Sequence, residues 1–329
     1  MTGSQRSALS IAGVARSTWH YRHHPRQRVV DPIPHKARAY RSRIPEADRA
    51  AIQELIGAGW TDGVSVDHAF ANAWDAGIML ASRRTWWRIA ADIDDQSDRP
   101  VAPTRARGGT PMRPAPVLQA TAPGQVWSWD ITDLRTPWRG VSFKAYSIID
   151  IYSRKLVGWR VEDREVDDLA VDMFKTAFAE HGQPAGVHAD SGPAMRSNAL
   201  KKLLADLGIT STHNRPRVSN DNPFSESEFR TMKYRPNYPG VFETIEDARA
   251  YMAWYVPWYN QNHKHSGIAL FSPNDVHNGS WRQLWEQRHT TQQTYYAAHP
   301  ERFRRPPKTP APSDTVGINL PKPERLQAA

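Results

Sequence analysis

Val126-Trp127-Ser128-Trp129-Asp130-Ile131 is a run rich in β-branched and aromatic residues that contains one carboxylate. Two runs of the same character follow at 143–151 and 155–161, with short turns between them. Residues of these types favour β-strands, so the three runs predict a three-stranded meander. From about 167 to 178 the apolar residues recur at helical spacing, which predicts an amphipathic helix after the third strand.

Strands and helices alternate after this meander. A short strand at 186–189 ends in Asp190, and a helix with four leucines follows at 200–207. A strand at 209–213 then precedes a helix from about 222 to 234. Three strands followed by helix, strand, helix, strand and helix predict an α/β domain with a mixed sheet.

Three carboxylates occupy related positions in this pattern. Asp130 lies within the first strand, Asp190 follows the fourth, and Glu226 falls at the start of the helix near 222–234. They can meet only if the first and fourth strands are neighbours and the helix packs beside them. A buried trio of carboxylates repels itself unless a divalent cation lies between its members. By spacing alone, three unrelated surface acids among the 34 acidic residues are the alternative to a metal site.

The sequence around each acid resembles one block of the catalytic core of DDE transposases and retroviral-type integrases. The three blocks are WSWDIT at 127–132, HADSG at 188–192 and SNDNPFSES at 219–227. Between Asp190 and Glu226 lie 35 residues, the D-D-35-E spacing of that superfamily. Each acid therefore stands in its own matching block, at the matching distance.

Flanking blocks extend the resemblance to about residues 10–280. WYNQNHKHSG at 258–267 and the Ser-Pro pair at 272–273 resemble blocks that follow the catalytic helix in this family. VARSTWHY at 14–21 resembles an N-terminal helix of insertion-sequence transposases of the OrfB type. His263-Lys264 departs from the usual Arg-Pro, which leaves the role of that block open.

The resemblance implies an RNase H-like α/β fold: a mixed five-stranded sheet with flanking helices, preceded by an all-α helix-turn-helix region. It implies a DNA transposase, a polynucleotidyl transferase that cleaves the ends of an insertion sequence and transfers them to target DNA. Asp130, Asp190 and Glu226 would be the catalytic residues and the ligands of two Mg²⁺ ions, for which Mn²⁺ can substitute. Lys233 stands seven residues after Glu226, on the same helix face, and would contact DNA.

The region before residue 98 has a helical pattern. In 10–19 and again in 77–88, a glycine is followed by apolar residues, a serine and a helix that carries Arg and Trp. This order indicates helix-turn-helix units, whose second helix enters the major groove of DNA. The expected DNA-binding residues are then Arg16, Arg83 and Arg84, and an ordinary helical hairpin is the alternative.

Charge is distributed unevenly over the 329 residues, whose net charge is +9. Residues 1–43 carry +8, whereas 99–119 and 281–329 carry +4 each. Basic arms around a nearly neutral body suit a polyanion, although solvated tails have the same composition. We divide the chain into a helical helix-turn-helix DNA-binding region at 1–98, a basic Pro-rich linker at 99–119, an RNase H-like catalytic core at 120–280 and a basic C-terminal extension at 281–329. The Pro-rich, basic stretch that begins near Arg302 is expected to be loosely ordered.

The absence of cysteine excludes disulfides, thiolate zinc sites and the zinc-binding His/Cys domain of retroviral integrases. No apolar run is long enough for a membrane span. We therefore expect a cytoplasmic bacterial protein, associated with the nucleoid when DNA-bound and without a membrane partner. Its expected partners are double-stranded DNA, as element ends and target, and further copies of itself in a dimer or higher multimer.

Other polar residues near the acids have structural explanations. Asp133 lies an odd number of positions from Asp130 and should point to the opposite face, and Asp150 is expected to be structural. Asp221 and Asn222 precede the helix of Glu226 and are expected to cap it. Two other functions remain compatible with the residues: a metal nuclease of the same fold that does not join DNA, and a DNA-binding architectural protein with vestigial acids.

Overall fold

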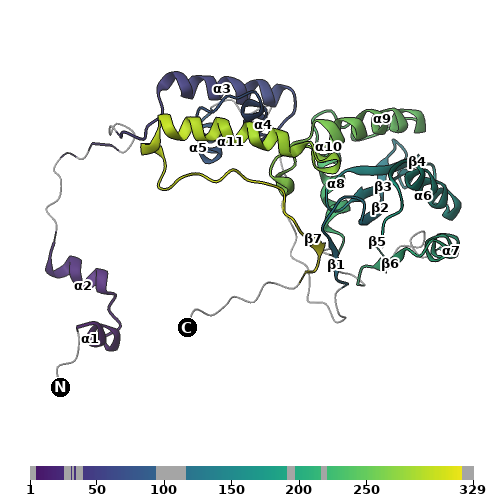
Figure 1. Ribbon diagram of the computed structural model, residues 1–329, viewed down its shortest axis with the longest axis horizontal. Helices are drawn as coiled ribbons and strands as arrows, with labels where there is room; N and C mark the ends of the chain where they lie inside the picture. The colour runs from purple at the N-terminus through teal and green to yellow at the C-terminus, as the bar shows by residue number, and fades with distance from the viewer. Residues whose placement is uncertain are drawn as a thin grey trace. The chain divides into compact units, whose positions relative to one another are not determined.

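The computed structural model describes residues 5–25, 31, 33–34, 40–93, 116–190, 197–215 and 221–320. By internal contacts the chain divides into two compact units, Met1–Arg43 and Ile44–Ala329 (Figure 1). This boundary falls inside the region 1–98 that the sequence suggested as one part. Most of the linker expected at 99–119 lies outside the described residues, so that part of the division stays a prediction.

The first unit contains a helical hairpin. α1 (Gln5–Ile11) and α2 (Arg16–His23) are joined by a turn in which Gly13 has a φ of +63°. Glycine adopts this left-handed backbone without steric cost, which explains its place in the turn. Arg16 begins α2 and is exposed.

The second unit starts with three helices that share a core. They are α3 (Glu46–Thr61), α4 (Val66–Asp75) and α5 (Arg83–Ala91). Their buried side chains include Ile52, Ile56, Phe70, Trp74 and Trp86. α4 and α5 flank a turn in which Gly77 has a φ of +78°, so the helix–glycine–helix order expected here is confirmed.

α11 (Trp281–Ala298) packs against α4. Trp74 Nε1 donates a hydrogen bond of 2.9 Å to the carbonyl oxygen of Arg288, and the side-chain amide of Gln287 donates one of 2.7 Å to the carbonyl oxygen of Asp75. This helix lies before the stretch near Arg302 that was expected to be loosely ordered. Its partners lie about 200 positions earlier in the chain, where local composition gives no sign of them.

Five strands form a mixed sheet in the order β4-β3-β2-β5-β6. Their bounds are β2 (Val126–Arg135), β3 (Ser142–Asp150), β4 (Leu156–Glu162), β5 (Gly186–Ala189) and β6 (Thr210–His213). β3 is antiparallel to both β2 and β4, whereas β5 is parallel to both β2 and β6. The predicted RNase H-like five-stranded sheet with its initial meander is confirmed.

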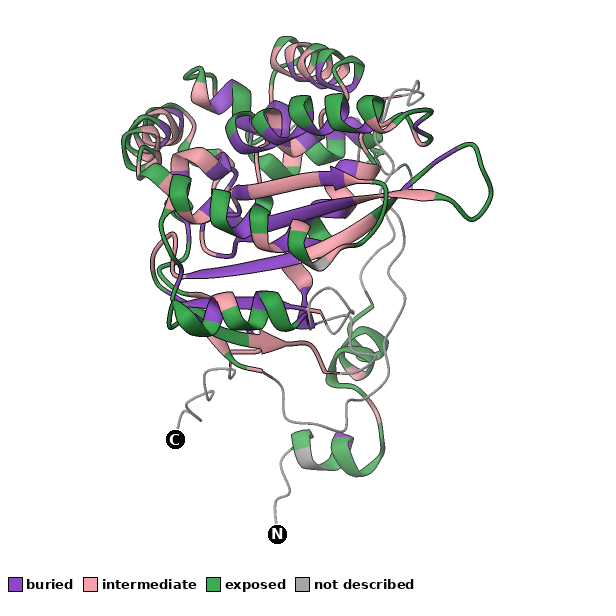
Figure 2. Cartoon of the chain, turned by 90° about the vertical axis from the view of Figure 1, so that its right-hand side faces the viewer, coloured by how far each residue is buried: buried purple, intermediate pink, exposed green. Residues whose placement is uncertain are grey.

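Helices cover both faces of this sheet, and the buried strands lie between them (Figure 2). α6 (Asp167–His181) and α7 (Asn198–Asp206) share one core with the sheet, and α8 (Pro223–Lys233) and α9 (Ile245–Gln261) share another. Side chains alternate along a strand. Trp127 and Trp129 therefore enter the core beneath α6 and α7, whereas Ser128 and Asp130 face α8.

Short elements complete the described chain. They are α10 (Pro273–Asn278) and the single-turn helices η4 (Ser266–Ile268) and η5 (Pro300–Arg302). β1 (Leu118–Ala120) pairs antiparallel with β7 (Val316–Ile318), which joins the start of the core to the C-terminal segment. Among the described residues, no helix is long and apolar enough to cross a membrane.

Candidate active site

Asp130 lies on β2, and Asp190 directly follows the neighbouring strand β5. β2 and β5 run parallel, and Trp129 pairs with Ala189 in their register. Asp130 and Asp190 each follow this pair by one position, so the two carboxylates start from adjacent backbone positions. The neighbouring placement of the first and fourth predicted strands, which a joint site requires, is confirmed.

Glu226 comes from the first turn of α8. Pro223 begins that helix, a position where the missing N–H has no helical partner to lose. α8 packs against β2 and β3, and Ser225 Oγ lies 3.2 Å from Ser128 Oγ on β2. The first turn of α8 is thereby held beside the strand that carries Asp130.

The negative charges of the other two acids act on the carboxyl group of Asp130. Burial is the main cause that raises the pKa of Asp130 to about 7, and the negative charges of Asp190 and Glu226 raise it further. The backbone N–H of Ile131, 2.8 Å from Asp130 Oδ1, and the charge of Lys233 act in the opposite direction. The fold therefore brings the three predicted site acids into electrostatic range of one another.

The donor chemistry of this trio fits a divalent cation. Carboxylate oxygens are the ligands that Mg²⁺ prefers, and a cation would balance the negative charges of Asp190 and Glu226 that act on Asp130. As the side chains stand in the described ranges, no group of three or more His, Asp or Glu could hold a metal ion. The carboxylates would have to approach one another to bind one, so metal ligation by these residues stays a prediction.

Lys233, the last residue of α8, lies beside β2. Its Nζ donates a hydrogen bond of 2.6 Å to Thr132 Oγ1, two positions after Asp130 on the same strand. Burial lowers the pKa of Lys233, and the charges of nearby acids, Asp130 among them, oppose this. The lysine is thus near the acids, as predicted, and its contact with DNA remains untested.

Asp221 and Asn222 do not cap α8 in the way that we predicted. Asn222 occupies the N-cap position, yet its side chain makes no capping hydrogen bond. Its Oδ1 instead accepts a hydrogen bond from Ser128 Oγ, and Asp221 forms a buried ion pair with Arg215 at 2.8 Å. The sequence signal was that of a local cap, but charged and buried partners are stronger competitors for these side chains.

His188 is a site residue that the sequence reasoning missed. It precedes Asp190 by two positions and is fully buried. Its Nε2 lies 2.8 Å from the carbonyl oxygen of Asp221, and its Nδ1 lies 2.8 Å from Thr212 Oγ1. A carbonyl oxygen only accepts, so Nε2 carries the proton and Nδ1 accepts from the threonine. Burial lowers the pKa of His188, in keeping with a neutral ring.

Comparison with known proteins matches the same part of the chain. Two models described as the integrase core domain match residues 120–219 and 207–273. Residues 120–273 are therefore similar to the integrase core domain.

Insertion-sequence transposases are among the curated relatives of this integrase core. The transposase for insertion sequence element IS904 of Lactococcus lactis is 35% identical over 162 residues, which cover 48% of this chain and 63% of that protein. Transposase InsF for insertion sequence IS3A of Escherichia coli is 30% identical over 162 residues, which cover 48% of this chain and 56% of that protein. The chain thus spans less than two thirds of the length of these relatives.

Solved retroviral integrases also align with the chain. The HTLV-2 integrase catalytic core domain, in complex with magnesium in a dimeric form, has a TM-score of 0.36 and 16% identity, covering 47% of this chain and 97% of that one. The catalytic core domain of BIV integrase has a TM-score of 0.36 and 20% identity, covering 49% of this chain and 97% of that one.

Glu228 is a second residue of the integrase core that the sequence reasoning missed. It is 1% exposed, and Ser147 Oγ donates a hydrogen bond of 3.2 Å to its Oε2. Its Oε1 is buried without a hydrogen-bond partner among the described residues. Burial raises the pKa of Glu228 to about 8. The available signal was its spacing of four from Met232, which places both on one helix face. A glutamate two positions from Glu226 nevertheless suggests surface charge.

The other acids near β2 behave as structural residues. Asp133 is exposed, and its Oδ1 accepts hydrogen bonds from Lys144 at 2.6 Å and Ser142 at 2.8 Å. Asp150 is fully buried and accepts hydrogen bonds from the backbone N–H groups of Gly124 and Ser153. Neither belongs to the trio, in agreement with the interpretation of the sequence.

The three predicted DNA-binding arginines differ in their surroundings. Arg83 donates to both carboxylate oxygens of Asp67, at 2.7 and 2.6 Å, and this pairing raises its pKa. Arg84 is exposed on α5, and Arg16 is exposed on α2. A role in DNA binding remains a prediction for all three, and the charge of Arg83 is already partly balanced by the protein.

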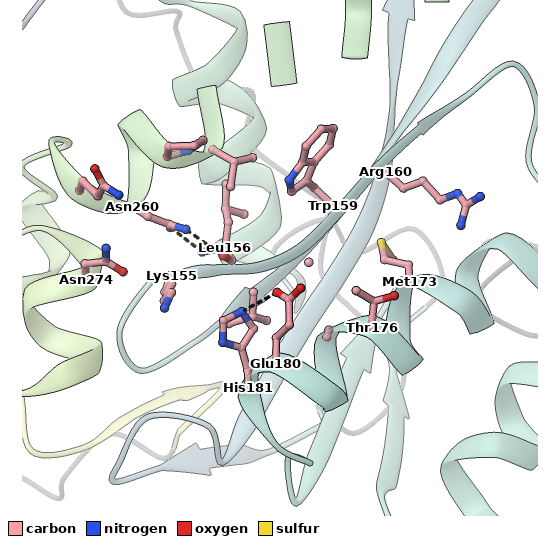
Figure 3. A pocket seen from close by; sticks show the side chains of 16 residues that line it. Lys155, Leu156, Trp159, Arg160, Met173, Thr176, Glu180, His181, Asn260 and Asn274 are labelled. Carbon is pink, nitrogen blue, oxygen red and sulfur yellow. Dashed lines mark hydrogen bonds and ion pairs between the residues drawn. The ribbon is translucent and has the colours of Figure 1, made fainter. Parts of the chain in front are cut away.

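A cavity of about 450 Å³ lies apart from the three acids (Figure 3). β4, α6 and α9 supply most of its lining, which includes Lys155, Glu180 and His181. The side chain of Asn260 is bonded to the backbone of Leu156. Its Oδ1 accepts a hydrogen bond of 2.8 Å from the N–H of Leu156, and its Nδ2 donates one of 2.9 Å to the carbonyl oxygen. None of the acids of the trio lines this cavity, so we treat it as separate from the candidate active site.

Proposed function

We propose that this chain is a DNA transposase whose integrase core cleaves the ends of an insertion sequence and joins them to target DNA. The observation that carries the proposal is how the elements of the acids lie together. Trp129 pairs with Ala189, one position before Asp130 and Asp190, and Ser225 Oγ of α8 lies 3.2 Å from Ser128 Oγ of β2. Three acids from β2, β5 and α8 share one electrostatic environment, although they are far apart in sequence. The names of the curated relatives, transposases of insertion sequences, support the same reaction.

In this proposal Asp130, Asp190 and Glu226 hold two Mg²⁺ ions, with Mn²⁺ as a substitute. When bound, the ions would activate a water or a 3′-hydroxyl and stabilise the leaving oxygen of the phosphodiester. The chain supplies the oxygen ligands and the rigid sheet on which they stand. No side chain needs to form a covalent bond with DNA.

Positive side chains would bind the DNA itself. Lys233 is placed to contact a phosphate beside the acids, since its Nζ already lies near the strand of Asp130. Arg16, Arg83 and Arg84 would contact DNA from the two helical hairpins, with Arg83 the weakest of them because of Asp67. We further propose double-stranded DNA as element ends and target, self-association into a dimer or higher multimer, and a cytoplasmic, nucleoid-associated location.

The test is a pair of assays with Mg²⁺: cleavage of a duplex that carries an uncut element end, and joining of pre-cut element ends to a target duplex. Asp190→Asn should abolish both cleavage and joining, because it removes a carboxylate from the trio. Asp133→Asn is the matched control, since Asp133 lies on β2 but pairs with Lys144 on the surface. Cleavage without joining in the wild type would indicate a nuclease instead. Unchanged activity in the Asp190→Asn variant would refute the catalytic proposal.

A further inference from the structure

Asp221 and Asn222 lie where the three elements that carry the acids meet. Asn222 Oδ1 accepts from Ser128 Oγ, and Asn222 Nδ2 lies 3.4 Å from the carbonyl oxygen of Trp129. Ser128 precedes Asp130 by two positions on β2, so the two side chains share a face of the sheet. Asn222 itself stands one helical turn before Glu226, which is on α8. This residue therefore joins the strand of Asp130 to the helix of Glu226.

The third acid is tied to the same place through His188. This residue precedes Asp190 by two positions, and its Nε2 donates to the carbonyl oxygen of Asp221 at 2.8 Å. Asp221 is fully buried, and its neighbour Asn222 is 1% exposed. The pair thus contacts β2 and β5 and directly precedes α8. These three elements must hold the acids at fixed separations. We call Asp221 and Asn222 the joint.

Charge-assisted hydrogen bonds hold the joint itself. Arg215 donates to Asp221 through its backbone N–H at 3.0 Å and through Nε and Nη2 at 2.8 Å each. These bonds hold the pKa of Asp221 at about 2, so its carboxylate stays charged at any working pH. A fourth donor comes from the C-terminal segment: Asn319 Nδ2 lies 3.0 Å from Asp221 Oδ1.

Asn319 is itself fixed in place. It follows β7, which pairs with β1, and its Nδ2 also donates to the carbonyl oxygen of Pro116 at 3.1 Å. Its φ of +52° lies in the left-handed region, where an asparagine is tolerated better than most residues. The backbone is thus turned so that the amide reaches the joint, about 100 positions after Asp221 in the chain.

We propose that Asp221 and Asn222 are positioning residues for the three acids, and that Asn319 on the C-terminal segment is a latch that holds them. The inference rests on the proposed function, since it assigns the latch to the geometry of the metal-binding trio. Hydrogen bonds made directly to metal ligands are worth about 10- to 100-fold in metal affinity or activity. Asn319 acts one contact further away, through Asp221. We expect loss of the Asn319 side chain to weaken metal binding by about tenfold, the lower end of that range, because Arg215 still holds Asp221.

The test compares full-length Asn319→Gly with the wild type. Glycine keeps the left-handed backbone and removes only the amide. Asn319→Asp is a second variant, which places a carboxylate against that of Asp221. Thr309→Val is the matched control. It removes two side-chain contacts of the C-terminal segment, with Gln292 Oε1 and with His289 Nδ1, each at 2.9 Å, and neither involves the joint.

Two measurements need no catalysis: hydrogen exchange of the α8 amides without metal, and the dissociation constant for Mg²⁺ by calorimetry. Asn319→Gly should speed exchange in the first turn of α8 and weaken Mg²⁺ binding about tenfold, and Asn319→Asp should do both more strongly. The Thr309→Val variant should match the wild type. The half-saturating Mg²⁺ concentration for joining pre-cut ends should rise by the same factor.

Wild-type exchange and wild-type Mg²⁺ affinity in Asn319→Gly would overturn the proposal. Faster exchange with unchanged Mg²⁺ affinity would also overturn it, because the latch would then be structural only. If the wild type binds Mg²⁺ but does not join DNA, the proposed transposition fails, while exchange and calorimetry still decide the role of Asn319.

Discussion

The buried guanidinium group of Arg288 links helix α11 to Asp75, at the end of α4. Replacing Arg288 by methionine tests how much this contact contributes to stability. The side chain is 1% exposed, and its Nε lies 2.5 Å from Asp75 Oδ1 at the end of α4. Nη1 and Nη2 donate to the carbonyl oxygens of Ala269 and Leu270 at 3.1 and 3.0 Å. Methionine fills much of the same space and removes all of these bonds.

The expected loss of stability follows from what the substitution leaves unpaired. Breaking a buried ion pair by removing one partner costs about 3–5 kcal/mol. Asp75 keeps a second cation, because Lys264 Nζ lies 2.7 Å from its Oδ2. We therefore expect Arg288→Met to lower the free energy of unfolding by about 3 kcal/mol, at the lower end of that range.

The matched control is Lys202→Met. Its ion pair with Asp206 is of similar length, 3.0 Å, but the two side chains are 76% and 58% exposed. Such a pair contributes about 0–1 kcal/mol. Urea unfolding followed by tryptophan fluorescence gives both free energies. A loss below about 1 kcal/mol in Arg288→Met, or one equal to that of Lys202→Met, would refute the idea that this buried charge holds α11 in place.

Three further predictions concern pH and DNA. Burial raises the pKa of Glu228 to about 8, so the folded state loses stability as pH rises from about 4.5 to 8. This loss is on the order of 1.4 kcal/mol per pH unit, and Glu228→Gln should remove it. Melting experiments across that pH range measure it, and equal pH slopes in the two proteins would contradict the prediction. Burial lowers the pKa of His68 to about 4, with Lys264 and Arg235 contributing, so stability should fall as pH drops from 6.5 to 4. His68→Gln should make that fall shallower in the same melting series, and an unchanged acid limb would count against a buried neutral ring. Finally, Arg84→Ala should weaken binding to a DNA duplex, and reduce its salt dependence, more than Arg83→Ala, because Asp67 already neutralises Arg83; the opposite order in a salt titration would reject this ranking.

The parts of the site that could be predicted from sequence are those that depend on residues close together in the chain. A run of β-branched and aromatic residues indicated β2, and a short strand was predicted at 186–189, where β5 lies. One acid stands within or directly after each of these strands. The neighbouring placement of the two strands then followed from the requirement that Asp130 and Asp190 meet. The pattern of α8 placed Glu226 in its first turn, because Pro223 is a residue that starts helices.

The parts that could not be predicted depend on partners far away in the chain. Asp221 and Asn222 carry the local signal of a helix cap, and nothing near them indicates that Ser128 and Arg215 compete for their side chains. The Pro-rich, basic composition after residue 300 indicated a loose segment, because the pairing of β7 with β1 is invisible to local composition. Glu228 was missed since burial of a carboxylate is decided by the packing of α8 on the sheet.

The pairing of β1 with β7 also orders events during protein synthesis. Leu118 pairs with Ile318, so the strand that completes this contact leaves the ribosome about 200 residues after its partner. All three acids are translated long before residue 316, and their strands and helix can fold while β7 is still missing. A chain that stops early would carry every acid yet lack Asn319. On this view, the order of translation delays completion of the site until nearly the whole described chain has been made.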